Sequence, residues 1–120
     1  MTNYSSGHRA ERVAADYLRT LGYTIIELNW RHARAEIDIV AQKRPRFSRS
    51  GPIVFFEVKH RKSDRHGRGL DYITPAKVRQ MGFAAELWLS QYSRSDDYCL
   101  GAIELEGLDY TVTACLETIA

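Results

Sequence analysis

Apolar residues first recur at helical spacing over residues 8–21. Ala14, Leu18 and Leu21 share one stripe of this segment, as the side chains on the buried face of an amphipathic helix do. Gly22 follows, and glycine is common just past the last turn of a helix. The pattern therefore predicts an amphipathic helix that packs on a core.

After this helix, short apolar segments alternate with polar turns. β-Branched and aromatic residues indicate strands, and clusters of Gly, Pro and basic residues separate them. Thr74 and Pro75 predict the start of a second helix, because Thr caps well and Pro suits the first helical position. Strands are predicted at residues 23–30, 35–42, 53–60, 98–105 and 109–117, and the second helix is predicted to run from Thr74 to Tyr92. The order αβββαββ indicates one α/β domain over residues 1–120, with a mixed sheet flanked by helices.

The second predicted strand alternates apolar and charged positions. Ile37 and Ile39 are expected on one face, with Glu36, Asp38 and Val40 on the other. The first three strands can form an antiparallel meander, and the second helix can carry the chain across to the last two strands.

The third strand, FFEVKHRK, has an acid and a base inside an apolar run. Glu57 and Lys59 are two residues apart, so both point to the same face of a strand. Asp38 on the neighbouring strand can lie near Glu57, where cross-strand pairs meet. Two interpretations stay open: a cross-strand ion network on a half-exposed sheet face, or a site that binds a cation.

The second interpretation has a definite chemistry. Two adjacent carboxylates repel each other, and a cation between them relieves the repulsion. Oxygen ligands suit Mg²⁺ or Mn²⁺, which can polarise a phosphodiester and lower the pKa of a bound water. A lysine beside the ion could assist that water or neutralise charge on the phosphoryl oxygens.

Charge is distributed unevenly along the 120 residues. Residues 43–68 contain nine Lys and Arg against two acids, net +7, while the remainder has a net charge of −5. This asymmetry favours a polyanion as partner, with nucleic acid as the usual candidate, although two solvated loops would give the same count.

Other features of the composition narrow the class of protein. No apolar run reaches the length of a membrane span, and the N-terminus lacks the apolar core of a secretory signal, so a cytoplasmic protein is expected. Cys99 and Cys115 have no metal-type spacing and are expected to be two buried thiols, although their predicted strands are neighbours.

The D…ExK arrangement resembles the PD-(D/E)xK nuclease superfamily. More closely, the chain resembles the YraN-like family of small bacterial endonuclease-fold proteins, which are similar to archaeal Holliday-junction resolvases. The stretches that carry the resemblance are GHRAERVAADYLRTLGY (7–23), NWRHARAEIDIVA (29–41), VFFEVKHRK (54–62) and TPAKVRQM (74–81). The resemblance implies a restriction-endonuclease-like fold and a metal-dependent DNA endonuclease, with branched DNA as a candidate substrate.

The resemblance also implies roles for individual residues. Glu11 matches the family's helix glutamate, Asp38 its central aspartate, and Glu57 and Lys59 its ExK motif. Together these four would be the catalytic residues. Asp38, Glu57 and the main-chain carbonyl of Val58 would hold Mg²⁺ or Mn²⁺.

Basic residues near this motif are candidates for contacting DNA. Arg61 and Lys77 fall at basic positions of the family, and Lys62 follows directly after the motif. Arg44 and Arg46 lie in the basic loop 43–52, where their side chains can reach phosphates.

The match is incomplete. Ala35 stands where the family usually has glycine, and DDYCLGAIELEG replaces an Arg-Phe-Asp run near the C-terminus. Two other functions therefore stay open: a DNA-binding module without efficient cleavage, and an interaction protein in which these charges only stabilise the sheet. A homodimer is compatible with the likeness to resolvases, which cut two strands symmetrically.

Overall fold

The computed structural model describes residues 2–43, 51–62 and 72–120, with side chains from residue 8 onward. The elements are α1 (Thr2–Thr20), β1 (Tyr23–His32), β2 (Ala35–Lys43), β3 (Ile53–Arg61), α2 (Pro75–Gln91), β4 (Tyr98–Glu106) and β5 (Thr111–Leu116). The predicted order αβββαββ is confirmed, and the first helix begins at Thr2 rather than at residue 8.

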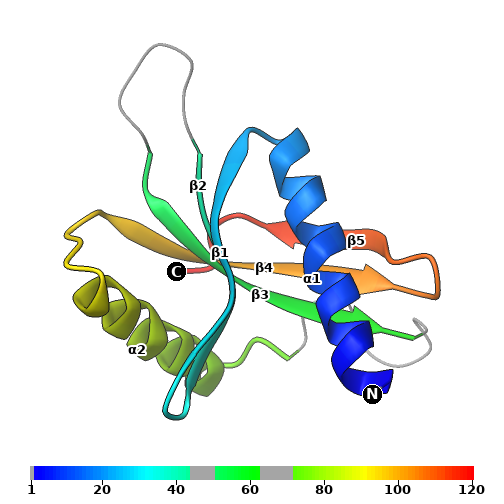
Figure 1. The fold of residues 1–120 in the computed structure, drawn as a ribbon, viewed down its shortest axis with the longest axis horizontal. Coiled ribbons are helices and arrows are strands. Elements are labelled where there is room, and N and C mark those ends of the chain that lie inside the picture. The colour runs from blue at the N-terminus through cyan, green and yellow to red at the C-terminus, as the bar shows by residue number, and fades with distance from the viewer. Residues whose placement is uncertain (1, 44–50, 63–71) are drawn as a thin grey trace.

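The five strands form one mixed sheet in the order β1-β2-β3-β4-β5. Neighbouring strands are antiparallel except β3 and β4, which are parallel. A parallel pair needs a crossover connection, and α2 supplies it by carrying the chain from β3 to β4. The predicted meander of the first three strands is confirmed (Figure 1).

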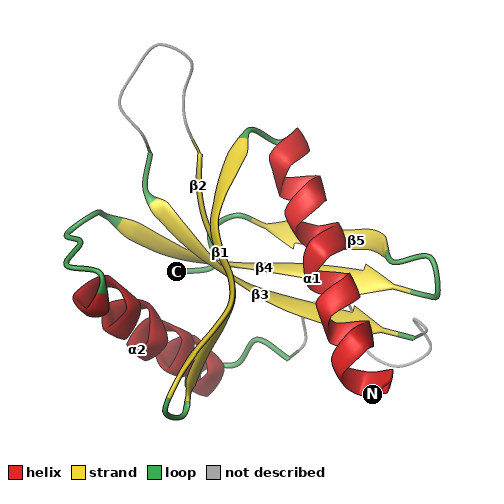
Figure 2. Cartoon of the chain, in the orientation of Figure 1, coloured by secondary structure: helices red, strands yellow, loops and turns green. Residues whose placement is uncertain are grey.

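The two helices cover different faces of the sheet, and successive residues of β3 alternate between them (Figure 2). Phe56 is buried on the α1 side together with Leu18. Phe55 is buried on the α2 side, where its ring meets Trp88 edge-on with centroids 5.6 Å apart. Burying each phenyl ring contributes about 2–3 kcal/mol to stability, so these two layers hold β3 in the centre of the fold.

The strict alternation predicted for the second strand is wrong. Ile37 packs with the α2 side and Ile39 with the α1 side, so the two isoleucines lie on different faces. Their partners on β1 flank Asn29, whose φ of 55° is left-handed and breaks the regular pleat. Asp38 therefore lies at the point where the strand changes face.

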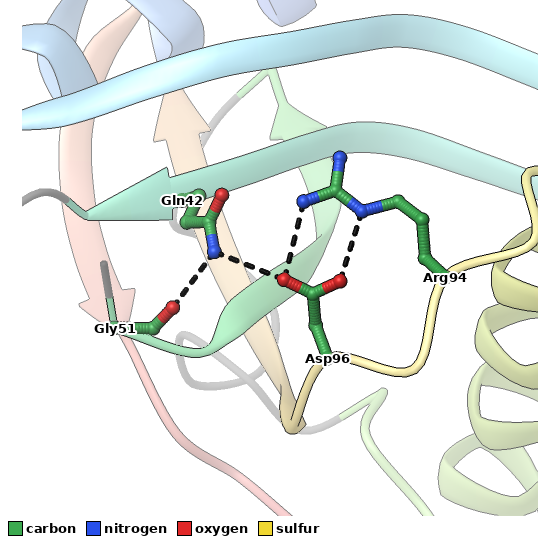
Figure 3. A network of polar contacts seen from close by, with 4 residues as sticks. All are labelled: Gln42, Gly51, Arg94 and Asp96. Atoms are coloured by element: carbon green, nitrogen blue, oxygen red, sulfur yellow. Dashed lines mark hydrogen bonds and ion pairs between the residues drawn. The ribbon is translucent and has the colours of Figure 1, made fainter. Parts of the chain in front are cut away.

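A polar network closes the base of the loop between β2 and β3 (Figure 3). Gln42, which is buried, donates from Nε2 to the Gly51 carbonyl at 2.8 Å and to Asp96 Oδ2 at 3.3 Å. Arg94 donates to both oxygens of Asp96, at 2.9 and 3.1 Å, and lowers the pKa of that carboxyl. The network ties the loop base to the segment that leads into β4, at the opposite end of β2 from Asp38.

Two glycines give opposite predictions for stability. A Cβ on Gly101 would lie 2.6 Å from a ring carbon of Phe56 and 2.8 Å from the carbonyl oxygen of Leu116. We expect Gly101→Ala to destabilise the protein by about 2–4 kcal/mol, since a backbone carbonyl in a sheet cannot move aside. Gly82, in the middle of α2, has open space around its Cβ position, so Gly82→Ala is expected to stabilise by about 0.5–1 kcal/mol. Urea unfolding of both variants checks this, and equal effects would contradict it.

Two expectations from the composition can also be compared with the structure. Cys99 on β4 and Cys115 on β5 are free thiols, as expected, and each is half-buried rather than fully buried. In the described part of the chain, no helix is both long enough and apolar enough to span a membrane.

Candidate active site

β2 and β3 separate at the end of their ladder. Their pairing ends at Ile39 and Phe56, whereas β3 stays paired with β4 over its whole length. The Asp38 carboxylate enters the gap, where its Oδ2 accepts a hydrogen bond from the Val58 amide at 2.8 Å. We call this place, formed by Asp38 and residues 57–59, the β2–β3 fork. The fork brings the predicted aspartate against the predicted ExK motif.

Three carboxylates gather at the fork. The pKa of Asp38 is raised to about 7, chiefly by burial and next by the negative charge of Glu57, and the amide of Val58 acts in the opposite direction. α1 brings Glu11 to the same place: burial raises its pKa, while a hydrogen bond with Asp38 lowers it. The structure therefore unites residues from α1, β2 and β3 that lie far apart in the sequence, and Asp38 is the most strongly perturbed of them.

Two lysines lie beside Glu57. Lys77 Nζ is 3.1 Å from Glu57 Oε2, so the two side chains form an ion pair. The predicted helix start is confirmed: Thr74 caps α2 by accepting a hydrogen bond from the Lys77 amide at 3.1 Å, which fixes the turn that carries this lysine. Lys59 is exposed, and its Nζ lies 5.7 Å from the ring centroid of Tyr72. On the α2 face of the fork, Glu57 is therefore paired with Lys77, while Lys59 remains exposed.

Tyr72 adds a polar group that the sequence did not single out. Its hydroxyl is buried and makes no hydrogen bond within the described part of the chain. Burial raises the pKa of this hydroxyl, and the charges of Glu57, Glu104 and Asp38 raise it further, so it lies within reach of the fork's electric field. A buried hydroxyl without a partner costs about 1–3 kcal/mol, which fits a group that binds a ligand or water. The sequence before Tyr72 carries no motif, so no sequence signal marked this residue.

The other predicted DNA contacts lie in different surroundings. Arg61 is half-buried and its Nε lies 2.5 Å from Glu104 Oε2, so this guanidinium has a protein partner. Lys62 is exposed at the end of β3. Arg44 and Arg46 lie outside the described residues. DNA contact by each of them stays a prediction.

Glu36 lies beside the fork and lines the same groove as Glu57, but it is not buried. It is exposed and pairs with Arg31, whose Nη1 lies 2.6 Å from Glu36 Oε2. Its charge still contributes to raising the pKa of Asp38, although less than burial and Glu57 do.

The donor atoms at the fork indicate whether it suits a metal ion, and which one. Within the described ranges, no group of three or more His, Cys, Asp and Glu side chains is placed to hold a metal ion. A cation would therefore depend on two carboxylates, Asp38 and Glu57, together with the carbonyl of Val58. Such a set of hard oxygen ligands, completed by water, suits Mg²⁺ or Mn²⁺. The mutual repulsion that raises the pKa of Asp38 also fits a cation site.

Comparisons with known proteins match most of the chain, including the fork. The model of the "Uncharacterised protein family UPF0102" matches residues 10–105, a range that includes α1 from Ala10 onward, the fork and α2, and leaves out β5.

Individual relatives cover similar parts. A UPF0102 protein of Mycolicibacterium vanbaalenii is 38% identical over 85 residues, which span 71% of this chain and 65% of that protein. One from Vibrio campbellii is 36% identical over 89 residues, spanning 74% and 68%. One from Neisseria gonorrhoeae is 32% identical over 106 residues, spanning 88% and 87%. The chain belongs to the UPF0102 family.

Proposed function

We propose that the chain is a metal-dependent endonuclease that hydrolyses phosphodiester bonds in DNA at the β2–β3 fork, with branched or otherwise structured DNA as its substrate. The observation that carries this proposal is the Asp38 carboxylate, half-buried beside Glu57 and Glu11 with its pKa raised to about 7. Gathering acids in this way lowers the stability of the folded chain, and strongly perturbed acids concentrate at functional sites. A divalent cation would offset their repulsion.

Asp38, Glu57 and the Val58 carbonyl would hold Mg²⁺ or Mn²⁺. When bound, the ion would polarise the phosphodiester and lower the pKa of a bound water. The amide of Val58 already donates to Asp38, so the main chain of β3 orients that carboxylate without any ligand. Glu11 lies close enough to Asp38 to influence its charge and would help to orient the same carboxylate.

Lys59 supplies the positive charge that the reaction needs. Its ammonium is exposed on the same face as Glu57, where a phosphate approaching the fork would meet it. There it would orient the attacking water or neutralise charge that grows on the phosphoryl oxygens. The excess of basic residues in segment 43–68 supports DNA as the polyanion, and binding should weaken with salt.

A second function, a DNA-binding module without efficient cleavage, is favoured by one contact. The ion pair between Lys77 and Glu57 at 3.1 Å already neutralises one of the carboxylates that would hold the metal. A module of this kind would bind DNA with salt-dependent affinity and yield no metal-dependent product.

We expect Lys59→Met to slow cleavage by about 100-fold or more, because the loss of one charge-stabilising group typically costs this much. The assay uses labelled linear, nicked, flapped and four-way DNA with Mg²⁺ or Mn²⁺. Arg19→Met is the control, since Arg19 is an exposed cation in the last turn of α1, pairs with Asp16 and is not a predicted DNA contact. Equal cleavage rates for the two variants would show that Lys59 has no special role in the reaction. Binding of all DNAs without product from the wild type would leave only the binding module.

A further inference from the structure

A groove of about 570 Å³ opens beside the fork, between the β1–β2 turn and α2. Figure 1 shows this turn next to the N-terminal half of α2. The turn contributes His32 and Arg34, and α2 contributes Met81, Phe83 and Leu87 to the lining. Glu57 and Lys77 of the candidate active site line the same groove. The groove and the fork are therefore continuous.

Flat rings line the groove from both sides. Phe83 is 68% exposed, which is unusual for a phenylalanine in the middle of a helix. On the other side, the His32 ring stacks on buried Trp30 with centroids 6.2 Å apart and planes 20° apart. The stack holds the imidazole as part of the wall. Both surfaces are suited to a planar apolar ligand.

Charges of both signs accompany these rings: Arg34 and Lys77 are positive, and Glu36 and Glu57 are negative. Arg34 on the turn is exposed, and Lys77 lies where the groove meets the fork. Proteins that bind single-stranded nucleic acid combine aromatic platforms for bases with cations along the backbone. The volume lies well within the range of small-molecule pockets, about 300–1,000 Å³, and is enough for a nucleotide. Lys77 is paired with Glu57, so the exposed Arg34 would supply the opposite charge for a phosphate at the rim.

We propose that the groove holds an unpaired nucleobase of the DNA strand, stacked against Phe83, so that cleavage is directed to DNA with unpaired nucleotides next to a duplex. This inference rests on the proposed function and names its substrate class. A base in fully paired duplex cannot enter the groove without leaving its stack, which costs a few kcal/mol. Flaps and junctions with unpaired nucleotides avoid that cost.

The test measures binding apart from cleavage, with wild-type protein in EDTA and fluorescence anisotropy of labelled DNA. We expect a duplex with a short single-stranded flap to bind about 10-fold or more tightly than the same duplex without it. Phe83→Ala is expected to weaken flap binding by about 5- to 50-fold, the scale of one lost base stack. Tyr92→Ala is the control, because Tyr92 is 49% exposed at the other end of α2 and does not line the groove.

A second set of DNAs tests the stacking itself. Abasic nucleotides in the flap should weaken binding to the wild type as much as Phe83→Ala does, and should weaken the variant no further. Equal affinity for duplex and flap, or full additivity of the two changes, would overturn the inference. So would a wild-type dimer in light scattering that Phe83→Ala dissociates, because a second copy would then occupy the groove. If the protein prefers flapped DNA but does not cleave it in Mg²⁺ or Mn²⁺, the inference that the groove binds an unpaired base would stand. Only the proposed nuclease activity would then be refuted.

Discussion

Asp38→Asn is expected to make the protein more stable at pH 8, by about 2–4 kcal/mol. Asn keeps the acceptor that the Val58 amide uses, and it removes the charge that Glu57 and Glu11 repel. A pKa about three units above its ordinary value corresponds to about 4 kcal/mol, at about 1.4 kcal/mol per unit, and the partial exposure of Asp38 lowers the expected gain into this range. For a chain of 120 residues, the melting temperature should rise by roughly 5–15 °C. An acid that destabilises the fold at its own position is expected to serve a purpose other than stability, such as function.

The gain should depend on pH in a definite direction. The unfolded chain releases the Asp38 proton near the ordinary aspartate pKa of 3.8, whereas the folded chain holds it up to about pH 7. Between these values the folded state binds more protons, so the unfolding free energy of the wild type falls as pH rises from about 4 to about 7. Glu11, whose pKa is also raised, acts in the same direction. Asp38→Asn removes most of this slope.

Thermal melts from pH 4.5 to pH 8.5 measure the effect. The two proteins should differ little at pH 4.5 and most above pH 7. Mn²⁺ should raise the melting temperature of the wild type at pH 8 and leave the variant nearly unchanged. Asp16→Asn serves as control, because Asp16 is an exposed acid on α1 and should alter neither curve. A destabilised Asp38→Asn protein would mean that the carboxylate stabilises the sheet.

The largest loss of stability is expected for Glu104→Ala, about 3–5 kcal/mol. Glu104 is 2% exposed on β4, pairs with Arg61 and accepts a hydrogen bond from the Thr113 hydroxyl at 3.0 Å. Removing one partner of a buried ion pair leaves the other charge poorly compensated in the interior. Chemical denaturation of the variant and of Glu104→Gln separates the charge from the shape, since Gln retains hydrogen-bonding capacity and should lose less.

A double replacement makes this prediction sharper. Apolar residues often substitute for a buried ion pair without loss, so Glu104→Leu combined with Arg61→Met should recover much of the stability that Glu104→Ala loses. The double variant also tests DNA contact apart from stability. It lacks Arg61, a predicted DNA-binding residue, but should remain folded. A double variant as unstable as Glu104→Ala would contradict the ion-pair explanation.

Local patterns in the sequence predicted the elements and the main acids of the site. Thr74 and Pro75 mark the start of α2 because capping depends only on neighbouring residues. Likewise, the meander brings Asp38 to β3 because consecutive strands usually pair. Register and face cannot be predicted from such local patterns. Asparagine tolerates the left-handed conformation of Asn29 but does not require it, and nothing in the sequence marks the end of the β2–β3 ladder. For that reason the alternation from Ile37 to Ile39 was predicted wrongly.

Contacts between distant segments could not be predicted from local sequence patterns either. The ion pair of Lys77 with Glu57 depends on where the crossover places the first turn of α2. The buried hydroxyl of Tyr72 depends on the path of the chain before α2. Glu11 was expected at the site only through a family resemblance, and its hydrogen bond with Asp38 requires α1 to pack on the fork. These contacts are set by tertiary packing, which pairs residues far apart in sequence.

The most direct test of the fork as a nuclease centre is single-turnover cleavage of an end-labelled flapped DNA by wild-type protein and Asp38→Asn, first in EDTA and then with Mg²⁺ or Mn²⁺. We predict product only from the wild type with metal, and a rate for the variant that is at least about 100-fold lower although it is folded and binds the DNA. Cleavage by Asp38→Asn at the wild-type rate, or no cleavage by the wild type with either metal, would contradict this account.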